Sequence, residues 1–67
     1  MRLYVSYYEF PKINGRIIPK GTKYYLTVDV EETDDENKLL ADVYSEVSKG
    51  TSVSKDCLKI AGWEELK

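Results

Sequence analysis

The sequence contains no histidine and only one cysteine, Cys57. One cysteine cannot form a disulfide within the chain, and a zinc site built from cysteines and histidines is excluded. The usual nucleophilic triads also need a histidine base, which the sequence does not have. We therefore expect a protein with no catalytic residues, no metal and no cofactor, in which Cys57 packs as a small apolar side chain.

Long hydrophobic runs are also missing. No apolar stretch approaches the roughly 20 residues that a membrane-spanning helix needs, and residues 1–8 are too few and too polar for a signal peptide. The 67 residues are 42% hydrophobic and 33% charged, which is typical of a soluble globular domain. We expect one small intracellular domain over residues 1–67, for which a homodimer is a further way to bury apolar surface.

The net charge is only −2, but it is unevenly distributed along the chain. Residues 1–25 hold five bases and one acid, whereas residues 26–46 hold eight acids and one base. The overall negative charge disfavours general binding to a phosphate backbone. The block around Asp34, Asp35 and Glu36 is expected to be a solvated loop, in which charge reversal leaves the fold intact.

Alternating apolar and polar residues over 23–31 give the strongest strand signal in the chain. Residues 1–8 alternate in the same way. Between these two segments, Asn14-Gly15 predicts a type I′ hairpin turn. Pro19 and Gly21 then predict a second turn.

The segment from residue 38 to residue 47 fits two patterns. Leu39, Ala41 and Val43 would share one face of a strand, whereas a helix over residues 35–47 would also collect its leucines and valines on one stripe. The β-propensity of Val43, Tyr44 and Val47 favours the strand. Further along, Ser54 caps either a short helical turn followed by a strand from Cys57 or a helix that runs to Ala61.

Short strands separated by turns predict a mainly β fold, which is either a five-stranded barrel or a curved antiparallel sheet. At most one short helix is expected, near residues 54–61. The expected core is made of inward-facing strand residues: Leu3, Val5, Tyr7, Ile17, Tyr24, Leu26, Val28, Leu39, Ala41, Val43, Leu58 and Ile60.

Residues 12–60 resemble the small SH3-like barrels of phages and mobile elements. The resemblance rests on the hairpin of residues 13–18, the turn Pro19-Lys20-Gly21-Thr22, and the segment Ser54-Lys55-Asp56-Cys57-Leu58. It implies a binding module rather than an enzyme, acting in the cytoplasm of a bacterial host cell. An inhibitor or modulator of a larger host protein would fit that description.

The six tyrosines point to a binding surface. On the expected strands Tyr4, Tyr8, Tyr25 and Tyr44 face outward, and tyrosine is enriched at interfaces, although cross-strand packing uses it as well. We predict that these four tyrosines, with Asp34, Asp35 and Glu36, bind a basic surface of another protein. The alternative is a barrel that stacks single-stranded nucleic acid on tyrosines beside Arg2, Arg16, Lys20 and Lys23.

Overall fold

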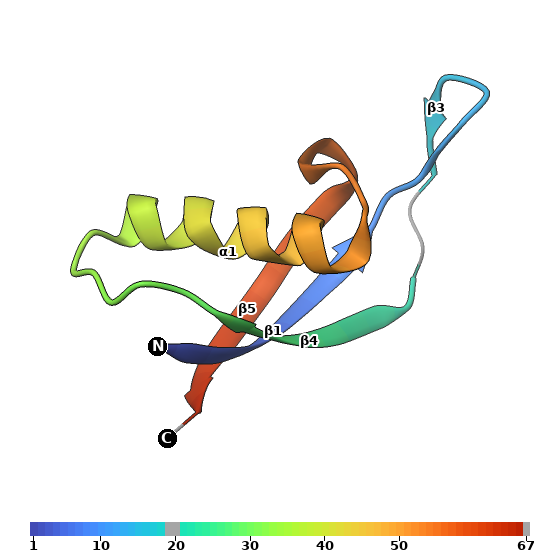
Figure 1. Ribbon diagram of the computed structural model, residues 1–67. Helices are drawn as coiled ribbons and strands as arrows, with labels where there is room; N and C mark the ends of the chain where they lie inside the picture. The colour runs from blue at the N-terminus through green and yellow to red at the C-terminus, as the bar shows by residue number, and fades with distance from the viewer. Residues whose placement is uncertain (19–20, 67) are drawn as a thin grey trace.

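The structure, a computed structural model, describes residues 1–18 and 21–66, which form an antiparallel sheet covered on one face by a helix (Figure 1). The main sheet has the strand order β4-β1-β5, and β2 and β3 form a separate two-stranded hairpin. The elements are β1 (Arg2–Glu9), β2 (Lys12–Ile13), β3 (Arg16–Ile17), β4 (Lys23–Asp29), α1 (Glu36–Thr51), the 3-10 turn η1 (Lys55–Cys57) and β5 (Leu58–Leu66).

The mainly β fold with an antiparallel sheet and one helix is confirmed. Of the two predicted architectures the open sheet forms, because β4 and β5 both end the main sheet and do not pair with each other. The predicted turn at Pro19 lies outside the described residues. After Ser54 the chain makes only the three-residue turn η1 and then enters β5, so the interpretation with a final strand holds and the helix to Ala61 is wrong.

The strand predicted for residues 38–47 is also wrong, because this segment lies within α1. Leu39, Val43 and Val47 are spaced by four residues, so a helix gathers them on one face, where Val43 and Val47 are completely buried. The β-propensity of valine and tyrosine contributes less free energy than the burial of these side chains between α1 and the sheet. The helix ends at Thr51, and the residue after it, Ser52, has a left-handed φ of 59°.

The N-terminus of α1 is capped by Asp35. Its carboxylate accepts hydrogen bonds from the N–H groups of Asn37 at 3.0 Å and Lys38 at 3.3 Å. One residue of the predicted solvated loop, Asp35, is therefore structural, so reversing its charge should lower the stability of the fold, whereas Asp34 and Glu36 are exposed.

We expect Asp35→Ala to lower the free energy of unfolding by about 1 kcal/mol, the usual value of an N-cap side chain. Urea unfolding followed by circular dichroism measures this difference. Asp34→Ala is the matched control, because Asp34 is exposed one residue before the cap, and it should change stability by less than about 0.5 kcal/mol. Equal stability of the two variants would contradict the cap.

The core lies between α1 and the sheet. Its buried residues come from β1, β4, the segment after β4, α1 and β5: Leu3, Val5, Tyr7, Val28, Val30, Val43, Val47 and Leu58. Tyr7 stacks on Tyr24 at 5.7 Å between ring centroids. Burial, with smaller contributions from Glu9 and Tyr24, raises the pKa of Tyr7.

Two predicted core residues lie outside this core. Ala41 is exposed because it lies on the opposite side of α1 from the apolar stripe of Leu39, Val43 and Val47. Ile17 is 55% exposed because it belongs to the β2–β3 hairpin, which projects beyond one end of the sheet (Figure 1). The hairpin turn itself is confirmed, since Asn14 and Gly15 have φ values of 52° and 76°, as a type I′ turn requires.

Candidate functional site

The sheet face opposite α1 is open, since no other described element covers it (Figure 1). Residues that pair directly across antiparallel strands present their side chains on the same face. On this open face, each β1 residue lies between one residue of β4 and one of β5. From one end of the sheet to the other, the rows are Lys23-Tyr8-Lys59, Tyr25-Ser6-Gly62, Thr27-Tyr4-Glu64 and Asp29-Arg2-Leu66.

Three of the predicted binding residues meet on this face, which we call the tyrosine face: Tyr4, Tyr8 and Tyr25. Tyr4 and Tyr25 are 42% and 54% exposed, and their rings stack at 5.4 Å with an angle of 12° between their planes. Tyr8 is half-buried. A shallow hollow of about 280 Å³ lies beside the stacked pair, with Ser6, Gly62 and Glu64 among its lining residues. The aromatic surface predicted from strand periodicity therefore exists in this part of the molecule.

Tyr44 does not belong to the tyrosine face. It lies on α1, is half-buried and packs against the core. Its hydroxyl accepts a hydrogen bond from the backbone N–H of Ile60 at 3.2 Å, which links α1 to β5. The prediction failed here because it assigned Tyr44 to a strand, and outward alternation does not apply to a helix.

The predicted acidic residues lie at the opposite side of the sheet. Asp34, Asp35 and Glu36 are exposed where the chain enters α1, which is beyond the end of β4 and on the helix side (Figure 1). Asp29 connects the two regions, because it is on the tyrosine face and is also the last residue of β4.

The two ends of the molecule carry opposite charge. One end of the sheet holds the first residues of β1 and the last residues of β4 and β5, and α1 begins beside it (Figure 1). The β2–β3 hairpin lies at the opposite end. The first, acidic end holds two described bases, Arg2 and Lys38, and nine acids: Asp29, Glu31, Glu32, Asp34, Asp35, Glu36, Asp42, Glu64 and Glu65. The second, basic end holds three acids, Glu9, Glu46 and Asp56, and six described bases: Lys12, Arg16, Lys23, Lys49, Lys55 and Lys59.

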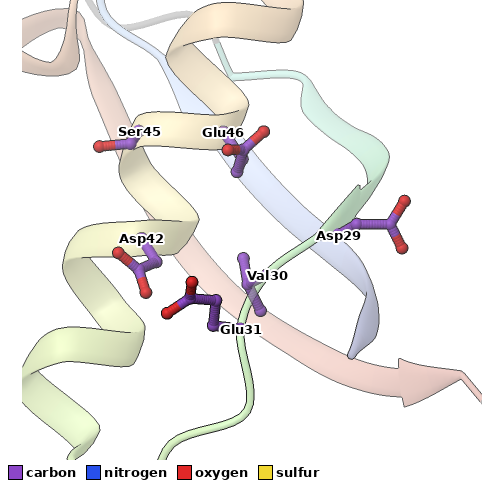
Figure 2. A pocket seen from close by; sticks show the side chains of 6 residues that line it. All are labelled: Asp29, Val30, Glu31, Asp42, Ser45 and Glu46. Carbon is purple, nitrogen blue, oxygen red and sulfur yellow. The ribbon is translucent and has the colours of Figure 1, made fainter.

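A groove that the sequence did not predict runs between β4 and α1. One hollow, of about 410 Å³, is lined by residues 26–29 of β4 and by Glu46, Lys49 and Gly50 of α1. A second, of about 330 Å³, continues from it past Val30 and Glu31 to Asp42 and Ser45 (Figure 2). Asp42 and Glu46 are four residues apart, so α1 presents both on one face.

The carboxylates of this groove are partly neutralised by neighbouring bases. Glu31 pairs with Lys38 at 3.2 Å, and Glu46 pairs with Lys49 at 3.7 Å. The Asp29 carboxylate points away from the groove (Figure 2) and pairs with Arg2 on the tyrosine face at 3.2 Å. The hydrogen bond from Lys38 to Glu31, and the charge of Glu31, raise the pKa of Lys38. Among residues 1–18 and 21–66, no three histidine, cysteine, aspartate or glutamate side chains gather in a way that could hold a metal ion.

Comparisons with known proteins add no family to this description. No family model matches the chain, and neither the curated proteins nor the solved structures contain a significant match. Within the described residues, no helix is long and apolar enough to span a membrane.

Proposed function

We propose that this chain is a non-enzymatic protein-binding module, which docks its tyrosine face and acidic end onto a basic surface of a larger protein. The stacked pair of Tyr4 and Tyr25 carries this proposal. Two large aromatic rings, each about half exposed, occupy the centre of a sheet face that no other described element covers. Stacking restricts their rotamers before binding, which lowers the entropy that association costs.

The charge distribution suggests what kind of partner would be favoured. The acidic end carries nine carboxylates and two bases within the described residues, so it would steer association toward a positively charged surface. Clustered carboxylates can also stand in for phosphates. An inhibitor or modulator that occupies the nucleic-acid site of a bacterial host protein would use this property.

A nucleic-acid function has one specific observation in its favour. Tyr8 lies between Lys23 and Lys59 on the tyrosine face, and aromatic rings beside cations on a sheet are typical platforms for unpaired bases. Glu64 and Asp29 lie on the other half of the same face, where they would repel a phosphate backbone. Titration with single-stranded DNA and RNA at several salt concentrations distinguishes protein binding from nucleic-acid binding. Micromolar affinity that falls steeply as the salt concentration rises supports only the nucleic-acid function.

The proposal is tested with a double variant, Tyr4→Ser with Tyr25→Ser. The wild-type chain is used to capture a partner from a bacterial lysate, and the dissociation constant for the purified partner is then measured for each variant. We expect the double variant to bind at least about 30-fold more weakly, which corresponds to about 2 kcal/mol for the loss of interface aromatics. Loss of the stacked pair should also lower the melting temperature by several degrees, so affinity is measured at a temperature at which circular dichroism shows both proteins folded.

The matched control replaces two exposed isoleucines of the hairpin, as Ile13→Ser with Ile17→Ser. These residues are 51% and 55% exposed and lie outside the tyrosine face, so affinity should stay within a factor of about three of wild type. If the tyrosine variant binds as tightly as wild type, the tyrosine face is not the interface and the proposal is wrong.

A further inference from the structure

The outer edge of β4 has unpaired backbone groups at known positions. Met1 and Val30 exchange two backbone hydrogen bonds, of 2.7 and 2.8 Å. Bonded and non-bonded pairs alternate along an antiparallel ladder, so Val28 and Leu26 bond to β1 in the same way as Val30. Thr27 and Asp29, in the non-bonded pairs, therefore direct their N–H and C=O groups away from β1.

Nothing in the described part of the chain pairs with these outward groups, because β4 is the last strand of its sheet. An unpaired strand edge is a template on which another strand can form. The β4 edge has the length for this, since its seven residues, Lys23–Asp29, form a regular strand with no register shift against β1.

The groove described above follows this same edge. Residues 26–30 of β4 and the segment after it form one wall, and α1 from Asp42 to Gly50 forms the other. At one end the groove is lined by the apolar side chain of Leu26. At the other end it is lined by the carboxylates of Glu31 and Asp42 (Figure 2). Three acids and one base line the groove with their side chains, so it favours a positively charged occupant: Glu31, Asp42, Glu46 and Lys49.

We infer that the groove binds an extended, lysine- or arginine-bearing peptide segment, which adds to β4 as a fourth strand of the sheet. In such β-augmentation, backbone hydrogen bonds supply affinity and alternate side chains supply specificity. The outward groups of Thr27 and Asp29 pair with the peptide backbone. A basic side chain of the peptide lies near Glu31 and Asp42, and an apolar one lies near Leu26. This inference rests on the proposed protein-binding function and names the part of the partner that is recognised.

The test uses a capped heptapeptide, Val-Thr-Val-Thr-Lys-Thr-Lys, added to the 15N-labelled protein and followed by NMR. Its valines and lysines share one face of a strand, so that the valines can lie near Leu26 while the lysines lie near Asp42. We expect the largest amide shifts at Thr27 and Asp29, because their N–H groups gain a hydrogen bond, and smaller shifts at Leu26 and Val28. A matched heptapeptide with glutamate in place of both lysines should bind at least about tenfold more weakly. No binding at millimolar peptide, equal binding of both peptides, or shifts confined to the tyrosine face would overturn the inference.

A backbone variant tests the added strand directly. Thr27→Pro removes the outward N–H and leaves the ladder to β1 intact, because proline is tolerated on an edge where its nitrogen faces solvent. It should weaken binding of the lysine-valine peptide at least about tenfold, whereas Thr27→Val should bind like wild type. Equal affinity of the proline and valine variants for the peptide would show that the peptide does not add to β4 as a strand. If Thr27→Pro does not fold, the amide shifts of the wild-type protein decide the question.

The two proposals can fail separately. In one outcome, the captured partner binds Thr27→Pro as tightly as wild type but binds the Tyr4 and Tyr25 double variant much more weakly. The partner then does not use the β4 groove, and the protein-binding function stands. If both variants retain the partner with unchanged affinity, neither surface is the interface.

Discussion

Replacing Leu3 with alanine is expected to lower the free energy of unfolding by about 3 kcal/mol, as for other buried leucines. Leu3 is 1% exposed and belongs to β1, which pairs with strands on both sides. Removal of its side chain leaves a cavity that the flanking strands and α1 are not free to fill. A domain of this size has a total stability of only a few kcal/mol, so a measurable unfolded population should appear at room temperature.

Urea unfolding followed by both tryptophan fluorescence and circular dichroism measures the effect. The matched control is Leu66→Ala, because Leu66 is the last residue of β5 and is 42% exposed. This control should cost less than about 0.5 kcal/mol. Similar losses at Leu3 and Leu66 would mean that β1 is not the centre of the sheet.

The second large effect is expected for Val43→Asp, which should leave the chain mostly unfolded at neutral pH. Val43 has no exposed surface, and an unpaired carboxylate at that position costs several kcal/mol. The burial would raise the folded-state pKa of the new carboxyl above its unfolded value. The penalty should therefore shrink as the pH falls through that raised pKa and the group becomes neutral.

Leu40→Asp is the control for this substitution. Leu40 lies three residues earlier on α1 and is 41% exposed, so the new carboxylate remains in water and the cost should stay near 1 kcal/mol or below. Thermal unfolding at pH 7 and pH 4 distinguishes the two variants. Equal tolerance of aspartate at 40 and 43 would contradict the helical stripe that faces the sheet.

The strands could be predicted from the sequence because their signals are local. Alternation placed Leu3, Val5 and Val28 in the core, and Asn14-Gly15 specified the hairpin turn without help from distant residues. The helix was missed because two local signals conflicted. The valines of residues 38–47 favour a strand, while Asp35 supplies a helix cap and the spacing of Leu39, Val43 and Val47 supplies an apolar stripe. Packing of that stripe on the sheet decides between them.

The same error explains which site residues could be predicted. Tyr4, Tyr8 and Tyr25 were placed correctly because alternation along β1 and β4 fixes the face of each side chain. Tyr44 was misplaced with the helix. The β4–α1 groove could not be predicted, since it depends on how far Asp42 and Glu46 of the helix lie from the edge of β4, and this is a tertiary distance.

Amide hydrogen exchange along β4 tests the open edge most directly, since an available strand edge is what the binding account needs. The N–H groups of Leu26 and Val28 bond to β1 and should exchange slowly, at rates set by unfolding, whereas those of Thr27 and Asp29 point to solvent and should exchange at least about a hundredfold faster. Alternating protection of this kind is the predicted result. Uniform slow exchange from residue 26 to residue 29 would show that the edge is already paired, and would contradict the account.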